Sequence, residues 1–424
     1  RMAVLEAYEV EQVGVRCFKR RCKVKEILNS LLTIDDATYM QLQAVPCKAE
    51  SENRVSHRLV HGELDVNRAI HGVVQDAVAC SGELKLLAQP DYSVLMESLT
   101  IIGNQAANTK VTQVICMESD SGPDGCSNLD IVCRILRYGI AICHYEPWYF
   151  YGKISEHFGN MNIFSYLIIT EHYALQITSD RKTAILHDSP DFVACFEEIF
   201  DRIRRQSQPL IDSMDGFLGQ QAQWGLQYAK TSDFSHTMEV CSGLCSIQFW
   251  DEKLIRGYMN PDLPGYETVI QNYTAYTQAL YQAKKQGQIT VFMNAAFVEE
   301  FIKDGIFREY PDIFFSRPVS QADRKKLIDR ILKAAEEGWY HVYMLPQEKF
   351  PLNYRWEVVV QHGSSLLFQY SYDNQFRIFR FLEADIIDAV YDFLEYLSAD
   401  PDILDEERSA GLLREWAERY LEHS

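Results

Sequence analysis

A thiol, an imidazole, a phenol and a carboxylate occupy four consecutive positions in the stretch GIAICHYEP, which ends at Pro147. Cys143, His144 and Glu146 carry ligand atoms that metal ions prefer, and the last two could also exchange protons with a substrate. The same stretch, rich in apolar and aromatic residues, is equally typical of a buried strand. The choice between a chemical site and a strand therefore depends on the rest of the chain.

A zinc-dependent hydrolytic site built on His144 and Glu146 would need a companion Pro-Cys-x-x-Cys sequence. The nearest pair of thiols, Cys241 and Cys245, has three intervening residues and no preceding proline. Glycine-rich phosphate loops, dinucleotide-binding fingerprints, HExxH and GxSxG sequences are also absent from the chain. We therefore predict no catalytic residue, no bound metal and no cofactor.

An internal repeat favours the strand. Residues 129–147 are matched by residues 328–346, and each segment is a helical pattern followed by glycine, a β-rich run and proline. The second copy replaces the four chemical groups of the first by Val342, Tyr343, Met344 and Leu345. The second copy keeps the glycine, the β-rich run and the proline but lacks the four chemical groups. We therefore interpret the stretch as a buried strand of an α/β sheet.

Two further pairs of segments extend the repeat. Residues 81–99 pair with 286–304 as a strand and a helix, and residues 166–203 pair with 356–397 as strands followed by an amphipathic helix. The apolar stripes of these two helices are formed by Phe192, Phe196, Ile199, Phe200, Ile386, Val390, Phe393 and Leu397. Helix-linked crossovers give parallel strands and tight hairpins give antiparallel ones, so each lobe should contain a mixed sheet.

The predicted organisation is an α/β fold of two repeated lobes. It consists of a helical N-terminal segment (1–60), a first lobe (61–206), a connecting segment (207–266), a second lobe (267–400) and a C-terminal helix (401–424). The connecting segment should supply a strand, a helix and a turn to one of the lobes. The apolar face of the last helix, which carries Leu413 and Trp416, either packs within the subunit or forms the contact of a homodimer.

Charge and composition limit the classes of partner. With a formal net charge of -19, the chain as a whole is a poor binder of polyanions, although 47% hydrophobic residues allow a sizeable core. One dense basic run, residues 16–25, is either a solvated helix face or a contact with nucleic acid or an acidic partner. Eleven cysteines, an odd number, favour reduced thiols in the cytoplasm, and the apolar runs are too short to span a membrane. The start at Arg1 suggests a fragment that lacks an upstream part.

Residues 165–203 resemble the second part of a phospholipase D-like half-domain, in which a strand, a turn and another strand lead to a closing helix. The resemblance rests on an Asp-x-Pro-Asp element and a Phe-x-x-x-Phe helix, formed by Asp188, Pro190, Asp191, Phe196 and Phe200. Two such halves, packed about a pseudo-twofold axis, are that family's arrangement. The resemblance therefore implies two phospholipase D-like lobes with this relation.

The chain departs from the family at its catalytic motif, a His-x-Lys followed by an aspartate, whose histidine attacks a phosphodiester. No His-x-Lys occurs in the sequence. If Glu171 and Gln361 stand for the motif's aspartate, aromatic rings take the histidine and lysine positions of both halves, at Phe164, Tyr166, Tyr354 and Trp356. A phosphodiesterase mechanism cannot run with these residues, so we expect the chain not to be an enzyme.

Catalytically silent versions of this fold resemble the effector-binding part of TrmB-type and related bacterial transcription regulators, where a helix-turn-helix domain precedes a dimerising body. The resemblance implies a ligand-sensing module that reaches DNA only through a missing upstream domain. Two alternatives stay open. One is a scaffold that binds only protein, and the other is a diverged hydrolase with an unrecognised site among His144, Glu146, His172 and Asp188.

The aromatic replacements also predict a ligand site. Side chains two apart on a strand share a face, so each lobe should present a pair of rings to the same side. We predict a cleft for a small effector, a sugar or a nucleotide-like molecule, that is lined by Phe164, Tyr166, Glu171, His172, Tyr354, Trp356, Gln361 and His362. The competing interpretation is that the rings only hold the two lobes together.

Overall fold

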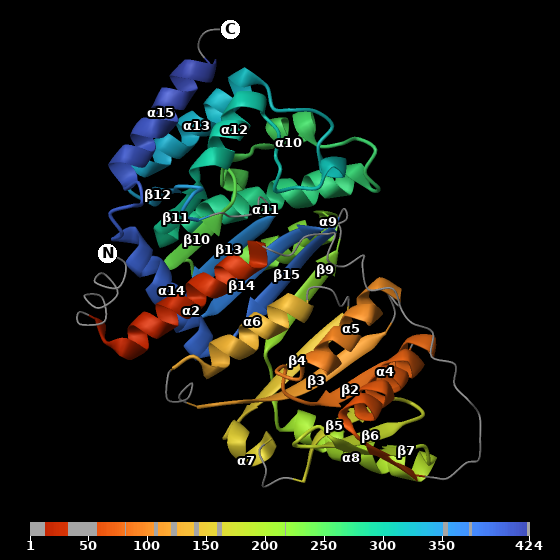
Figure 1. Cartoon of the computed structure of the whole chain (residues 1–424). Helices are drawn as coiled ribbons and strands as arrows, with labels where there is room; N and C mark the ends of the chain where they lie inside the picture. Colours follow the sequence, from red (N-terminus) through yellow and green to blue (C-terminus); the bar gives the residue numbers. More distant parts are fainter. Residues whose placement is uncertain are drawn as a thin grey trace. The chain divides into compact units, whose positions relative to one another are not determined.

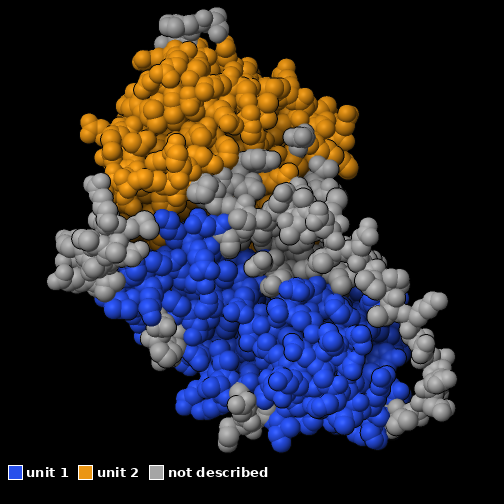
Figure 2. Space-filling view, viewed as in Figure 1, with its two compact units in different colours: residues 1–211 blue, residues 212–424 orange. Residues whose placement is uncertain are grey.

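The computed structural model forms two compact units, residues 1–211 and 212–424, which are described separately (Figures 1 and 2). The residues that the structure describes are 13–32, 57–80, 82–105, 109–119, 125–139, 144–158, 163–216, 218–350, 355–372 and 375–421. None of the helices in these ranges combines the length and the apolar character that crossing a membrane requires.

Unit 1 is built on a mixed sheet with the strand order β1-β7-β6-β5-β2-β3-β4-β8. The strands are β1 (His57–His61), β2 (Glu83–Leu87), β3 (Lys110–Met117), β4 (His144–Tyr151), β5 (Phe164–Ile169), β6 (Ala174–Thr178), β7 (Thr183–His187) and β8 (Gln208–Pro209). The helices are α2 (Val15–Leu32), α4 (Glu63–Ala79), α5 (Ser93–Gln105), α6 (Ser127–Gly139), α7 (Ile154–Phe158) and α8 (Pro190–Arg205). Strands β2, β3 and β4 are parallel, and β5 runs antiparallel to β2.

Unit 2 has a second mixed sheet, in the order β12-β11-β10-β13-β14-β15-β9. Its strands are β9 (Ile211–Gly216), β10 (Thr237–Cys241), β11 (Ile289–Asn294), β12 (Tyr340–Leu345), β13 (Trp356–Gln361), β14 (Ser365–Tyr372) and β15 (Gln375–Phe381). Its helices are α9 (Leu218–Thr231), η1 (Ile247–Phe249), α10 (Glu252–Tyr258), α11 (Tyr266–Gly287), α12 (Ala295–Asp304), η2 (Asp312–Phe314), α13 (Gln321–Glu336), α14 (Ala384–Ser398) and α15 (Glu406–Leu421).

The two sheets share one strand order. Read from its other edge, the second sheet runs β9-β15-β14-β13-β10-β11-β12, which matches β1-β7-β6-β5-β2-β3-β4 of unit 1. Strand β10 is parallel to β11 and antiparallel to β13, as β2 is to β3 and β5. The prediction of an α/β fold with two mixed sheets is confirmed.

One pairing in the predicted repeat is wrong by one strand. The segment 81–99 contains β2, whose counterpart in the shared strand order is β10, whereas the matched segment 286–304 contains β11. The expected connecting segment, 207–266, thus contributes β10 to the middle of the second sheet. The shift arises because α10 and α11 lengthen the crossover between β10 and β11, which in unit 1 is filled by α5 alone.

Helix packing follows the predicted apolar stripes in unit 2 but only partly in unit 1. On α14 the stripe is buried against β13 and β14, and Leu413 and Trp416 of α15 are buried where that helix packs on α13. On α8, Val193 and Phe200 are buried, whereas Phe192 is 45% exposed. The face of α8 that meets the sheet is therefore rotated from the one that the sequence predicted.

The basic run lies on α2, which packs on α6 of the same unit. Val24 and Ile27 are buried in this contact, Lys23 pairs with Asp130 at 2.5 Å, and Arg20 donates to a backbone carbonyl of the loop before α6. Part of the positive charge is thus neutralised within unit 1. This arrangement favours the interpretation of the run as a helix face.

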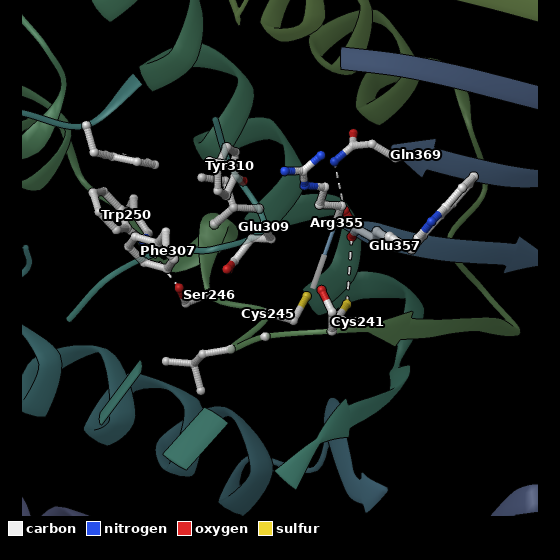
Figure 3. A pocket seen from close by; sticks show the side chains of 16 residues that line it. Cys241, Cys245, Ser246, Trp250, Phe307, Glu309, Tyr310, Arg355, Glu357 and Gln369 are labelled. Atoms are coloured by element: carbon white, nitrogen blue, oxygen red, sulfur yellow. Dashed lines mark hydrogen bonds between the residues drawn. The ribbon is translucent and has the colours of Figure 1, made fainter. Parts of the chain in front are cut away.

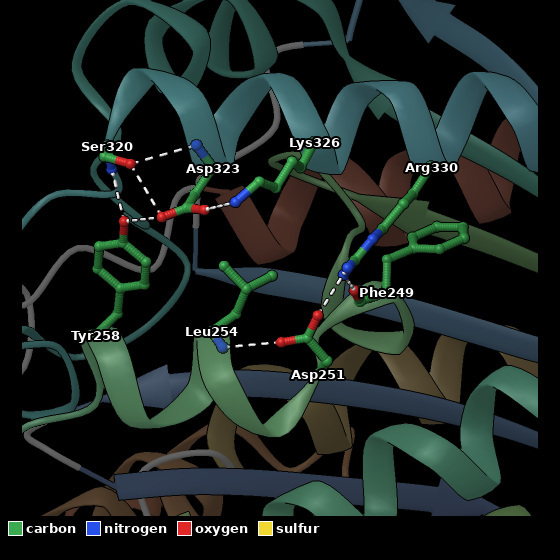
Figure 4. Close-up of polar contacts among 8 residues, drawn as sticks. All are labelled: Phe249, Asp251, Leu254, Tyr258, Ser320, Asp323, Lys326 and Arg330. Carbon is green, nitrogen blue, oxygen red and sulfur yellow. Dashed lines mark hydrogen bonds and ion pairs between the residues drawn. The ribbon is translucent and has the colours of Figure 1, made fainter.

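Polar side chains join α10 to α13 in unit 2 (Figure 4). Ser320 caps α13 by accepting from the Asp323 amide, and the Tyr258 hydroxyl of α10 donates to the Asp323 carboxylate at 2.5 Å. Asp251 caps α10 and also pairs with Arg330 of α13 at 2.7 Å. Each capping group therefore stabilises its own helix start and one contact between the two helices.

Candidate functional site

The predicted aromatic pair of unit 1 does not share a face. A β-bulge lies between Phe164 and Tyr166, and it interrupts the alternation of side chains along β5. Phe164 is 36% exposed and Tyr166 only 3% exposed. The Tyr166 hydroxyl accepts from Arg181, which lies over the tyrosine ring and pairs with Asp91 at 2.9 Å. Tyr166 is thus engaged in the packing of its own unit.

The predicted residues of unit 2 lie along β13 and just after it. Trp356 is buried and stacks on Tyr370 with ring centroids 4.6 Å apart. Gln361 is fully buried, while His362 is exposed and stacks on Tyr391 at 4.5 Å. Tyr354 lies outside the described residues. The cleft that all these residues would share with those of unit 1 stays a prediction.

His172 and Glu171 lie on the exposed turn between β5 and β6. The Nδ1 atom of His172 is 3.2 Å from an Asp76 carboxylate oxygen and 3.7 Å from the Cys80 thiol. The hydrolase alternative would need His172 to work together with His144 on β4. Three strand spacings separate β5 from β4, so the two strands lie roughly 14 Å apart in the sheet.

The part of the opening stretch from His144 to Pro147 begins β4, as predicted, whereas Gly139 ends α6 and residues 140–143, Cys143 among them, lie outside the described residues. Tyr145 is buried and donates to Gln113 of the neighbouring strand at 2.7 Å. His144 is exposed because it is the first residue of the strand, so the prediction that it is buried is wrong. Glu146 pairs with Lys110 at 3.0 Å.

The strongest concentration of buried ionisable groups lies in unit 2, at the carboxyl end of β10. Cys241 ends this strand, and Glu239 lies two residues earlier on the same face. The antiparallel register places Glu357 of β13 directly opposite Cys241. A short turn then brings Cys245 back toward Glu239, so that its thiol lies 3.4 Å from a carboxylate oxygen. These four residues are called the thiol–carboxylate cluster below.

Contacts around the cluster fix its two carboxylates. Lys284 of α11 pairs with Glu239 at 2.7 Å, and both side chains are almost fully buried. The Cys241 thiol donates to Glu357 at 3.8 Å, and the amide of Gln369 on β14 donates to the other oxygen of Glu357 at 3.1 Å. The two carboxylates are therefore held from different elements.

The cluster borders two small cavities. The first, of about 40 Å³, is lined by both thiols, Glu357, Trp356 and Glu309 (Figure 3). The second, of about 50 Å³, is lined by both carboxylates of the cluster and by Lys284. Volumes of this size hold a few water molecules or an ion, whereas pockets for drug-sized ligands measure about 300 to 1,000 Å³.

Burial sets the protonation of these groups. Burial, and then the negative charge of Glu239, raise the pKa of Glu357 to about 7, and burial raises the pKa of Glu309 to about 8. Burial alone would lower the pKa of Lys284, but the charge of Glu239 outweighs it and holds that pKa above its ordinary value. The carboxyl groups of Glu357 and Glu309 therefore hold protons near neutral pH, and a cation that binds there displaces those protons.

The same physics argues against covalent catalysis at this place. A hydrogen bond with Cys245, together with burial, raises the pKa of the Cys241 thiol well above its ordinary value. A thiol acts as a nucleophile through its thiolate, so a raised pKa lowers its reactivity. The neighbouring cavity would also be too small for an organic substrate.

Sequence reasoning considered Cys241 and Cys245 only as partners of His144, and it missed both glutamates and Lys284. The signal that could have identified them is a charged residue inside an apolar strand. All five residues of β10 are buried, so Glu239 must have a partner that offsets its charge. No such signal links Cys241 to Glu357, because 116 residues separate them in the sequence.

Comparisons with known proteins give little guidance. No family model matches the chain, and no curated protein matches it. Among solved structures, the chain is similar to TrmBL2, an archaeal chromatin protein, with 10% identity, a TM-score of 0.25 and 49% of this chain covered. It is also similar to a polyphosphate kinase from Porphyromonas gingivalis, with 13% identity, a TM-score of 0.25 and 86% of this chain covered. The chain spans 66% of the length of the first structure and 55% of the second.

Proposed function

We propose that the chain is a non-enzymatic ligand-binding module, and that its ligand site is the cavity beside the thiol–carboxylate cluster of unit 2. The observation that carries this proposal is the convergence of two thiols and two carboxylates, from β10, the turn after it and β13, beside two small cavities. Burying so many ionisable groups is costly unless a partner offsets their charge. A bound ligand is such a partner.

The biological setting that we propose is the sensing part of a bacterial transcription regulator. Support comes from the sequence resemblance to catalytically silent phospholipase D-like lobes and from the aromatic rings that replace the family's nucleophile. The alternative of a diverged hydrolase is less well supported, because its suspected residues are spread over β4, the turn after β5 and the end of β7 in unit 1. In this proposal, binding in unit 2 changes the protein's conformation and not the ligand's bonds.

The charges around the cavity indicate the class of ligand. Glu357 and Glu309 both line it, and Arg355 is the basic residue among the side chains that do so. Carboxyl and thiol groups become negatively charged when a cation displaces their protons, and they then bind that cation. The site should therefore take a cation, and its volume limits that cation to an ion or to the head of a small basic group.

The test is a thermal-shift and calorimetric screen of the full chain. Metal ions, ammonium compounds and small amidines would be screened with wild type and with Glu357→Gln, and Glu348→Gln, which removes an exposed carboxyl of unit 2, would serve as a surface control. A ligand that binds the folded state raises the unfolding midpoint by linkage. We expect a cationic ligand to stabilise the wild type and the control and to lose most of its effect in Glu357→Gln. If no cation shifts the wild type, or if every shift survives Glu357→Gln, the proposal is wrong.

A further inference from the structure

We propose that Cys241, Cys245, Glu239 and Glu357 form a binding site for a divalent metal ion of the zinc class. This inference rests on the proposed function, because it names the cation that the cavity of unit 2 would take. It differs from the zinc site considered in the sequence analysis, since the partners of the two thiols are carboxylates of β10 and β13 and not residues of unit 1.

The distances within the cluster suit a tetrahedral site. Metal–ligand bonds of about 2.0 to 2.3 Å in a tetrahedron place the ligand atoms roughly 3.3 to 3.8 Å from one another. Cys245 Sγ lies 3.4 Å from Glu239, and Cys241 Sγ lies 3.8 Å from Glu357. One ligand atom from each of the four residues lies within 4.8 Å of all the others. Small side-chain rotations would therefore be enough to close the site around an ion.

The contacts behind the ligands have the form of a supporting shell. Gln369 donates to the Glu357 oxygen that does not face Cys241, and Gln221 donates to Gln369 in turn at 3.3 Å. Lys284 holds Glu239 from α11. Hydrogen bonds of this kind orient ligating carboxylates and strengthen metal binding. The side-chain oxygen of Gln221, a residue that is 3% exposed and lines the adjoining cavity, has no hydrogen-bond partner among the described residues.

Charge balance favours a divalent ion. Two thiolates and two carboxylates would bring four negative charges, of which a divalent metal ion offsets two. Lys284, which pairs with Glu239, and Arg355, which lines the cavity, bring one positive charge each. With Glu309 protonated, the site is then close to neutral, which a buried site requires.

Ligand chemistry selects the metal. Thiolate ligands favour zinc and other soft or borderline ions, whereas magnesium and calcium prefer sites made only of oxygen. Metal binding must displace the thiol protons and the proton of Glu357, so the affinity should rise with pH.

The test uses the reduced full chain after treatment with a chelator. Titration with Cd²⁺ reports thiolate ligands through their ultraviolet charge-transfer absorption, and Co²⁺ reports tetrahedral geometry through its visible bands. We expect one equivalent to bind to wild type, and the signal to be lost in the Cys241→Ser and Cys245→Ser variants, with affinity at least about 100-fold weaker. Far-UV circular dichroism would establish that the variants fold.

A matched control separates this cluster from the other group of possible ligands. Among the described residues, the exposed Cys80 and His172 form a second such group in unit 1 with the half-buried Asp76. Cys80→Ser should leave the Cd²⁺ signal in place if the inference is correct. If Cys80→Ser abolishes the Cd²⁺ signal, or if wild type binds no metal, the inference of a metal site in unit 2 is wrong. If wild type binds no metal but still binds an organic cation in a Glu357-dependent way, the metal site is wrong and the proposed function stands. If wild type binds no cation at all, the metal site and the proposed function are both wrong.

Discussion

At the scale of single residues, unit 2 keeps ionisable side chains where the chain elsewhere keeps apolar ones. Glu239 is 1% exposed inside a strand whose five residues are all buried, and Lys284 reaches it from a helix. Replacing such a pair by apolar residues of similar volume often leaves stability unchanged or increases it. Its presence therefore needs a reason other than stability, and ligand binding supplies one.

The raised pKa of Glu357 predicts how stability depends on pH. The folded-state pKa of about 7 exceeds the unfolded value near 4.5, so the folded protein binds more protons between these pH values. Stability should therefore fall as the pH rises from about 5 to about 8, by up to about 3 kcal/mol from this group. Glu357→Gln should remove that part of the slope.

The measurement is denaturant unfolding at several pH values, followed by tryptophan fluorescence. Five of the six tryptophans lie in unit 2, with Trp148 in unit 1, so the signal reports mainly on the relevant unit. Glu171→Gln, which removes an exposed carboxyl of unit 1, is the control. An equal slope in wild type and Glu357→Gln would contradict the prediction.

The lowered pKa of Asp323 predicts the opposite dependence of stability on pH. Burial alone would raise the pKa of Asp323, but hydrogen bonds from Lys326, Tyr258 and Ser320 lower that pKa to about 2. The contribution of Asp323 to the free energy of unfolding is fully present above the pKa of the unfolded state, near 4. It is lost as the pH falls toward 2. Asp323→Asn should cost roughly 1 to 2 kcal/mol at pH 7, and the deficit should shrink in acid. Tyr258→Phe should show part of this loss, whereas Tyr266→Phe should not, as unfolding curves at pH 7 and pH 3 would check.

At the scale of elements, the sequence was most informative where a segment carries its own periodicity. The helix-glycine-strand-proline pattern located α6, β4, α13 and β12, and the amphipathic stripe located α14. Strand β10 was placed less well, because it is only five residues long and carries a glutamate in its middle. The cluster could not be predicted, since the proximity of Cys241 to Glu357 depends on which strand pairs with β10.

The end of α12 offers a prediction on backbone geometry. Gly305 has φ of 76° there, and a Cβ atom at this position would lie 2.3 Å from the carbonyl oxygen of Val319. Gly305→Ala should therefore cost at least about 2 kcal/mol, from strain and from the clash with the backbone. Gly411, inside α15 with open space around its Cα, is the matched control. Gly411→Ala should be neutral or stabilise by about 0.5 to 1 kcal/mol, and equal effects of the two changes in denaturant unfolding would refute the argument.

At the scale of the whole molecule, a shared strand order is repeated in two units, but the buried ionisable cluster occurs in one. The place of Cys241 at the end of β10 corresponds to Leu87 at the end of β2, where the neighbouring side chains are apolar. In the described part of the chain, a repeated framework thus carries a buried cluster in unit 2 that has no counterpart at the matching place in unit 1. The fold could be predicted from the repeat itself, whereas the site is the part that departs from it.

The proposed absence of catalysis is also a statement about the whole chain. Purified protein should show no turnover of bis-p-nitrophenyl phosphate, with or without divalent metal, if the family resemblance inferred from the sequence is correct and rings stand at the nucleophile and lysine positions of both halves. The assay should include His172→Ala and His362→Ala variants. Turnover by wild type that either variant abolishes would overturn the non-enzyme proposal.

The central position of β10 also has a consequence for the order of events during synthesis. Its neighbour β13 is made more than a hundred residues later, since Cys241 and Glu357 are 116 residues apart. At about 5 to 20 residues per second, roughly 6 to 23 seconds pass before the ribosome has made both sides of the cluster. During that time Glu239 and the two thiols lack their final neighbours. The proposed ligands on β10 and the turn after it are therefore open to solvent throughout this interval, and pairing of β13 with β10 then covers them.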